Sequence, residues 1–205
     1  MTMQNVGYKA KALEPRNLLL YFLIAFGLPV LVFGPFMLGI LDYPSRPGPG
    51  LIFAFVVVQF APLIAAVVVT AATQGRTGLR ALWDRFWNRD LSLKWLLIIL
   101  LFNPMVRLLG NLISRAAGGE AYPFLEAQSL LSLLVTGFIV GVQEEFGWRG
   151  FVLPRFQAKW SALVSSLILG AIWAPYHLGN WILGARQDSF WEFSLWIILM
   201  AIFTT

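Results

Sequence analysis

Long apolar runs separated by short polar segments dominate this chain. Four of the longer runs have about the 20 residues that a helix needs to cross the hydrocarbon core of a bilayer. The run Ser129–Val142 is shorter and continues directly into the pair Glu144 and Glu145. A sixth run begins near Phe193 and extends to Thr205 over about 12 residues, too few to span. The pattern predicts an all-α fold, a polytopic transmembrane helix bundle of five spans and a truncated sixth. The five spans are Leu18–Ile40, Leu51–Ala72, Trp95–Ile113, Ser129–Val142 and Ala162–Leu183.

A different periodicity follows the second span, in the segment Thr77–Asp90. Its apolar residues recur at helical spacing and its charged residues occupy the opposite face, which predicts an amphipathic helix on the cytoplasmic membrane surface. We place a domain boundary just before this helix, with the first two transmembrane helices in residues 1–74 and a second domain in residues 75–205. The apolar side comprises Leu79, Leu82, Trp83, Phe86 and Trp87, and the charged side Arg80, Asp84, Arg85 and Arg89.

Composition predicts an integral membrane protein, with the lipid bilayer as one of its partners. The chain is 59% hydrophobic and 12% charged, with a mean hydropathy of +0.74, well outside the range of soluble domains. It contains no cysteine, which excludes a disulfide framework and a thiol nucleophile. The first apolar run is longer than the hydrophobic region of a cleaved signal peptide, so we expect it to be retained as a span.

The net charge of +5 raises the question of nucleic-acid binding, but the distribution of charge answers it. Eleven of the fifteen Lys and Arg residues lie in the N-terminal arm, in residues 76–94 and in residues 149–159, on alternate sides of the predicted spans. This is the positive-inside pattern, so we expect a cytoplasmic N-terminus, no nucleic-acid partner, and a multi-pass protein of a prokaryotic plasma membrane. The remaining four are Arg46, Arg107, Arg115 and Arg186.

Two adjacent carboxylates, Glu144 and Glu145, stand in the most apolar half of the chain. Ionisable side chains in a membrane segment are costly and usually mark a functional site. Arg149 lies four residues after Glu145, close enough on one helical face to form an ion pair. Glu144, rotated by about 100° from its neighbour, is then free to face a cavity and to take a proton from water.

The only histidine, His177, lies in the next apolar segment. Residues Gln157–Ser161 form the natural turn between these two segments, and an antiparallel hairpin folded there places Glu144 and His177 at the same depth, roughly 24 Å from the turn. We expect their side chains to approach within about 5 to 6 Å, the span of one bridging water. Such a pair can activate a water or share a metal ion.

Metal binding stays open at this point. A His-Glu-x-x-His zinc site needs two histidines and the chain has one. Glu144, Glu145 and His177 can still supply three ligands to a divalent ion such as zinc, with Asn180 one turn away as a fourth neighbour. Nothing in the sequence requires a cofactor. Taken singly, an ion pair or a lone histidine is an ordinary structural feature; together, at matched depth in a membrane, they favour a functional site.

These residues resemble the CPBP family of intramembrane proteases, which includes the type II CAAX prenyl endopeptidases and the lysostaphin-resistance-type membrane proteins. The first family motif, Glu-Glu-x-x-x-Arg, is matched by Glu144, Glu145 and Arg149. The second, Phe-x-x-x-His, appears from Trp173 to His177, with Trp in place of Phe. The resemblance extends from about Gly75 to the end of the chain.

The resemblance implies a peptidase that hydrolyses peptide bonds of membrane-associated peptides or proteins. Glu144 would activate the attacking water together with His177, and Glu145 and Arg149 would support the site. The family's third motif, a later His followed at i+4 by Asn or a similar residue, would fall beyond Thr205. We therefore expect the domain to be incomplete at its C-terminal end, as a fragment or as a protein with weak or lost activity.

Two other classes of function remain as alternatives. A non-catalytic membrane protein, for instance an immunity or scaffolding factor, would keep the same residues as a binding pocket. A proton-coupled carrier would use Glu and His as a relay, but the paired repeats and broken helices common in carriers are not visible in this sequence.

Overall fold

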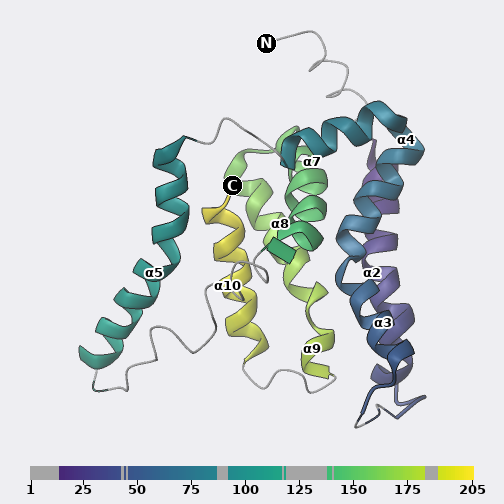
Figure 1. Ribbon diagram of the computed structural model, residues 1–205, viewed down its shortest axis with the longest axis horizontal. Coiled ribbons are helices and arrows are strands. Elements are labelled where there is room, and N and C mark those ends of the chain that lie inside the picture. Colours follow the sequence, from purple (N-terminus) through teal and green to yellow (C-terminus); the bar gives the residue numbers. More distant parts are fainter. Residues whose placement is uncertain are drawn as a thin grey trace. The chain divides into compact units, whose positions relative to one another are not determined.

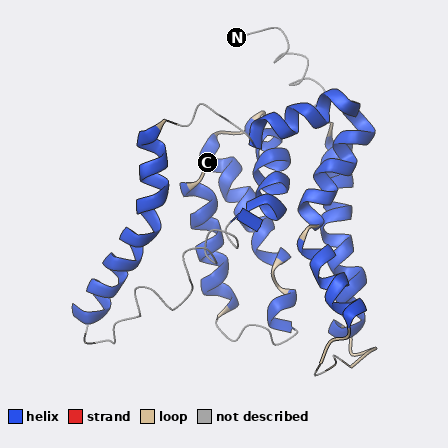
Figure 2. Cartoon of the chain, in the orientation of Figure 1, coloured by secondary structure: helices blue, strands red, loops and turns tan. Residues whose placement is uncertain are grey.

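Every regular element that the structure describes is helical, which confirms the all-α prediction (Figure 2). The computed structural model describes residues 14–42, 44, 46–86, 92–116, 118, 138–139, 141–182 and 189–205. The elements, labelled in Figure 1 where there is room, are α2 (Pro15–Met37), α3 (Pro49–Gln59), α4 (Ala61–Phe86), α5 (Leu93–Ala116), the π-helical segments η1 (Gly141–Glu145) and η2 (Trp148–Val152), α7 (Leu153–Gln157), α8 (Ala162–Tyr176), α9 (Gly179–Ile182) and α10 (Phe190–Phe203).

The chain divides into two compact units, one formed by residues 1–86 and 140–205 and the other by residues 87–139. The second unit contains α5, a 24-residue helix over the third predicted span. All the residues of the two sequence motifs lie in the first unit. The domain boundary predicted at residue 75 stays a prediction.

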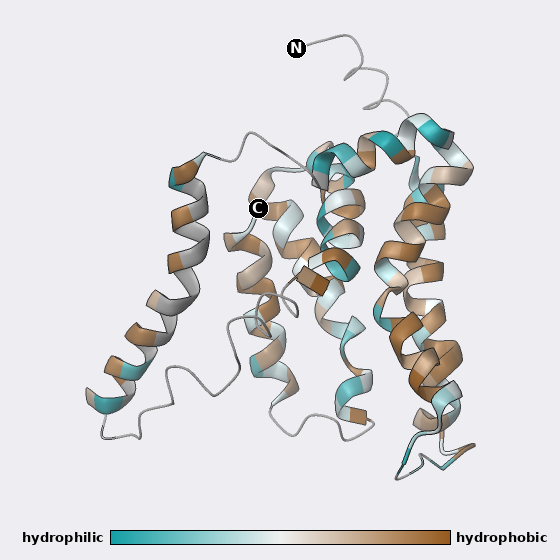
Figure 3. Ribbon diagram, viewed as in Figure 1, coloured by the Kyte–Doolittle hydropathy of each residue, from teal (hydrophilic) through white to brown (hydrophobic). Residues whose placement is uncertain are grey.

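Two described helical stretches, Pro15–Met37 and Ala162–Ile182, are long and apolar enough to cross a membrane, and the bent pair α3 and α4 is a third if it counts as one span. α10 is a shorter apolar helix of 14 residues. Figure 3 shows apolar residues along α2, α3 and the first part of α4. Most of the fourth predicted span, Ser129–Val142, lies outside the described residues, so the count of five spans stays a prediction.

The second predicted span is not one straight helix, contrary to the expectation for Leu51–Ala72. It is bent by 60° between α3 and α4, because Pro62 has no backbone N–H and its ring clashes with the carbonyl four residues earlier. That carbonyl belongs to Val58 and accepts a hydrogen bond from the Tyr176 hydroxyl at 2.9 Å. The break therefore ties α3 to the end of α8, next to His177.

A second bend in this region occurs inside α4 at Gly75, whose φ of 62° lies in the left-handed region that favours glycine. The helix after the bend is the predicted amphipathic helix, and it is helical to Phe86; residues 87–90 lie outside the described part. Its inner side buries Leu82, whereas Trp83 and Arg85 are exposed. Polar residues accordingly gather on this part of α4 in Figure 3. Its location on the membrane surface stays a prediction.

The core of the first unit places the glutamate motif between two helices. The segments η1 and η2 contact α4, and η2 and α7 contact α8, which packs against α10. Gly170 permits the last contact, since a Cβ atom there would lie 2.7 Å from the Cα of Ile198. Buried aromatic rings fill the centre, among them Tyr21, Trp148 and Phe151. The motif residues are thus held on a packed scaffold.

Candidate functional site

The helix that carries the glutamate pair is wound as two short π-helical segments, residues 141–145 and 148–152. The sequence spacing predicts an ordinary α-helix here, and in this respect the structure differs. Single-turn π segments are rare and frequently occur at functional sites. Gly147, between the two segments, lets this helix approach α4 closely, since a Cβ atom would lie 2.6 Å from the Pro62 carbonyl oxygen.

Glu144 is buried, with its side chain 8% exposed. Its Oε2 accepts a hydrogen bond from the indole Nε1 of Trp173 at 2.9 Å. The same oxygen lies 3.6 Å from Nε2 of His177. Trp173 of α8 and His177 at its end therefore converge on one carboxylate oxygen. The proximity predicted from the hairpin is confirmed, at a shorter distance than the expected one of about 5 to 6 Å.

His177 lies at the point where α8 ends. Pro175 in the last turn has no backbone N–H to donate. The helix ends in i→i−3 hydrogen bonds, from the His177 N–H to the Ala174 carbonyl at 3.1 Å and from the Leu178 N–H to the Pro175 carbonyl at 3.0 Å. The imidazole packs edge-on against Tyr176 and against Phe193 of α10, with centroid distances of 5.4 and 5.1 Å. Aromatic packing from two helices thus fixes the ring beside Glu144.

The ion pair predicted between Glu145 and Arg149 is present. Arg149 also donates a hydrogen bond to the hydroxyl of Thr204 at the end of α10, and its guanidinium lies over the Trp173 ring, 5.0 Å from the centroid. Glu145 is more exposed than Glu144, at 34% of its side chain. The two glutamates therefore have different environments, as their rotation around the helix predicts.

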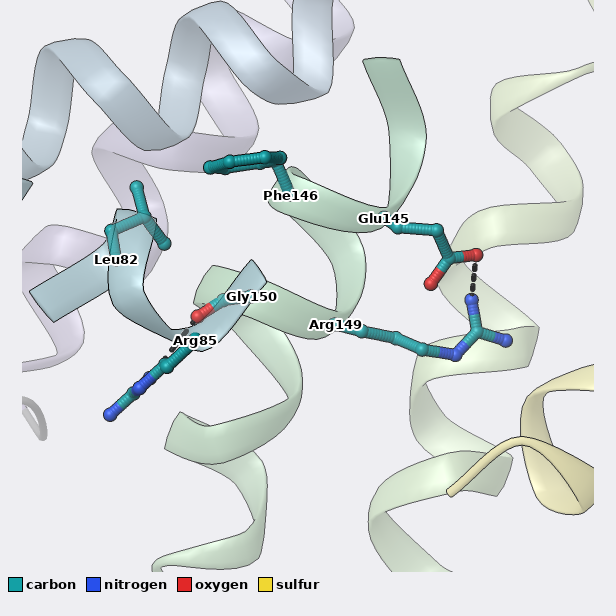
Figure 4. Close-up of a pocket in the computed structure, with 6 residues that line it drawn as sticks. All are labelled: Leu82, Arg85, Glu145, Phe146, Arg149 and Gly150. Carbon is teal, nitrogen blue, oxygen red and sulfur yellow. Dashed lines mark hydrogen bonds and ion pairs between the residues drawn. The ribbon is translucent and has the colours of Figure 1, made fainter. Parts of the chain in front are cut away.

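A cavity of about 240 Å³ lies between the helix that carries the glutamate pair and α4, on the side of Glu145. Figure 4 shows Arg149 directed toward Glu145 and away from Leu82, and Arg85 joined to the Gly150 carbonyl. Glu145 contributes to the lining of this cavity and Glu144 does not; Glu144 is buried against α8. The expectation that Glu144 faces a cavity stays a prediction. The lining residues are Leu82, Arg85, Glu145, Phe146, Arg149 and Gly150.

Three carboxylate or imidazole ligands do not converge in the described part of the chain, where no group of three or more His, Cys, Asp or Glu side chains is placed to hold a metal ion. Glu144 and His177 are close, but the Glu145 carboxylate is engaged by Arg149. Asn180 bonds the His177 carbonyl through its backbone N–H at 3.0 Å. The metal site formed by Glu144, Glu145 and His177 stays a prediction.

Two members of this arrangement are not identified by the motif analysis. Trp173 is noted there only as a substitution for Phe, although its position four residues before His177 puts both side chains on one face of α8. Thr204 has no recognisable signal in the sequence, because its role as an acceptor for Arg149 depends on how α10 packs against α8.

Comparison with known proteins agrees with the geometry. Residues 126–205, which contain both motifs, match the family model described as type II CAAX prenyl endopeptidase Rce1-like. The chain is also 26% identical to a CAAX prenyl protease 2 of Methanococcus maripaludis, over 57% of this chain and 46% of that protein. It spans about half the length of this curated relative. The resemblance stated from the two motifs is confirmed, and the protein is an integral membrane protein.

Proposed function

We propose that this protein is an intramembrane endopeptidase that hydrolyses peptide bonds of membrane-associated peptides or proteins, with Glu144 as the general base. The observation that carries the proposal is the 3.6 Å approach of the Glu144 carboxylate to the His177 imidazole inside a buried site. A carboxylate and an imidazole at this separation can both contact one water molecule and take its proton. The match to the Rce1-like family supports the same reaction.

In this mechanism the water oxygen attacks the scissile carbonyl carbon while Glu144 accepts the water proton. His177 hydrogen-bonds the water and sets the direction of attack. The tetrahedral intermediate then breaks its carbon–nitrogen bond, and the proton held by Glu144 passes to the leaving amine. Glu145 and Arg149 do not contact the water; they hold the turn and the neighbouring Trp173 in place.

The reaction needs water inside the membrane-embedded part of the protein, where irregular or polar structure is tolerated only beside a cavity or within protein. We place the N-terminus on the cytoplasmic side, so that the amphipathic part of α4 lies on the cytoplasmic membrane surface.

The test compares the wild-type protein with Glu144→Ala and His177→Ala on a library of membrane-associated peptides, including peptides with a prenylated C-terminal segment. Loss of a general base typically lowers the rate by about 10²–10⁴-fold, and we expect both variants to fall by that order. Equal cleavage by all three proteins would refute the assignment. Binding of peptides without cleavage by the wild-type protein would favour the non-catalytic alternative.

A further inference from the structure

We propose that Trp173 is a positioning residue that fixes the Glu144 carboxylate and links the second glutamate of the motif to the first. The proposal rests on the proposed function, because it assigns Trp173 to the same reaction. It is carried by two independent contacts, one on the edge of the indole ring and one on its face.

The contact on the edge is the hydrogen bond from Nε1 of Trp173 to Oε2 of Glu144, 2.9 Å long and buried. A bond to an ionised acceptor is stronger than one between neutral groups. It holds Oε2 in place beside His177 and restricts rotation of the carboxylate. The second motif of the family that this chain resembles is Phe-x-x-x-His, and this chain has Trp173 in place of the Phe. A phenyl ring has no N–H to donate, so this hydrogen bond depends on the tryptophan.

The contact on the face is the Arg149 guanidinium, 5.0 Å from the ring centroid. Arg149 is held in turn by the ion pair with Glu145 and by the Thr204 hydroxyl. Arginine suits this place because its planar guanidinium can stack on an aromatic face while its donors bind a carboxylate. Contacts therefore run from Glu145 through Arg149 and Trp173 to Glu144.

This sequence of contacts explains how Glu145 supports the reaction without contacting water. Trp173 is only 4% exposed, and its ring lies 6.3 Å from the His177 ring, measured between centroids. Removing Glu145 or Arg149 lets the Trp173 ring move, and the Glu144 carboxylate then loses the hydrogen bond that holds it. Trp173 is thus the side chain through which both motifs hold one geometry.

The first test observes the hydrogen bond itself and needs no substrate. The protein has nine tryptophans, and their indole N–H resonances can be recorded by ¹⁵N NMR in detergent micelles. The resonance that disappears in Trp173→Phe is expected to move upfield in Glu144→Gln, because a neutral amide is a weaker acceptor than a carboxylate. Glu144→Gln retains Trp173, so a single indole resonance that moves upfield supports the bond even if Trp173→Phe does not fold.

The second test separates positioning from packing. Trp173→Phe is expected to lower kcat on the order of ten- to a hundredfold with KM nearly unchanged. Trp148→Phe is the matched control, because Trp148 is fully buried and its Nε1 has no hydrogen-bond partner among the described residues. We expect Trp148→Phe to lower thermal stability and to retain kcat.

A double-mutant cycle tests the link to Arg149. Arg149→Lys keeps the charge but loses the planar stack, and we expect its effect on kcat to shrink at least several-fold when Trp173 is already Phe. An indole resonance of Trp173 that is identical in wild type and Glu144→Gln, or equal kcat losses in Trp173→Phe and Trp148→Phe, would overturn the proposal. A wild-type protein that cleaves no peptide would instead refute the proposed function, and the NMR result would still decide the contact.

Discussion

Gly147 lies where the helix that carries the glutamate pair crosses α4, and its replacement by alanine tests this crossing. A Cβ atom there would lie 2.6 Å from the Pro62 carbonyl oxygen and would also meet the Tyr21 hydroxyl. Backbone cannot swing aside as the end of a long side chain can. Gly147→Ala must therefore separate the two helices or strain the turn between Glu144 and Arg149.

The expected size of the effect follows from the contact. Overpacking of a tight contact costs about 1–3 kcal/mol, and a glycine replaced by alanine in a helix recovers up to about 1 kcal/mol. Gly141→Ala is the matched control, since it lies in the same helix and nothing stands within 4 Å of its added Cβ. The gain in helix propensity is common to both variants, so the difference between their stabilities gives the steric cost at Gly147.

The assay is thermal unfolding in detergent micelles, followed by tryptophan fluorescence. With about 2–4 °C per kcal/mol for a chain of this length, we expect Gly147→Ala to melt roughly 2 to 12 °C below Gly141→Ala. Equal melting temperatures for the two variants would show that η1 and η2 do not pack against Pro62, and the placement of the glutamate pair would then be wrong.

Three further outcomes are expected. Tyr176→Phe removes the donor to the Val58 carbonyl and is expected to lower the free energy of unfolding by about 1 kcal/mol in the same melting assay; an unchanged melting temperature would refute that anchor. Gly170→Ala is expected to destabilise the packing of α8 on α10 by about 1–3 kcal/mol, because its Cβ would lie 2.7 Å from the Cα of Ile198; Gly27→Ala, with nothing within 4 Å, is its control. Treatment with a chelator is expected to leave peptide cleavage unchanged, because the second glutamate is held by its ion pair; loss of cleavage that zinc restores would favour the metal site instead.

The sequence predicts the local arrangement of the site well where a short-range rule applies. The ion pair of Glu145 and Arg149 follows from i,i+4 spacing. The approach of Glu144 to His177 follows from a short turn midway between two apolar segments. The helical class follows from runs of apolar residues long enough to satisfy the backbone within lipid.

Features that depend on long-range packing could not be predicted in this way. The bend of 60° between α3 and α4 has a local cause in Pro62. The Val58 carbonyl at this bend, however, accepts its hydrogen bond from the Tyr176 hydroxyl, more than a hundred residues away in the sequence. The bond from Trp173 to Glu144 depends on the depth at which α8 packs. The π-helical winding around the glutamate pair has no signature in the apolar periodicity that we used.

The central claim is that Glu144 and His177 act on one water as a unit, and a double-mutant cycle on peptide cleavage tests it most directly. The turnover of the peptide that the wild-type protein cleaves fastest is measured for Glu144→Ala, His177→Ala and the double variant. Residues that act as a unit are strongly non-additive, so we expect the double variant to be no slower than the slower single variant. Losses that multiply in the double variant would contradict a shared water and assign the two residues to separate steps.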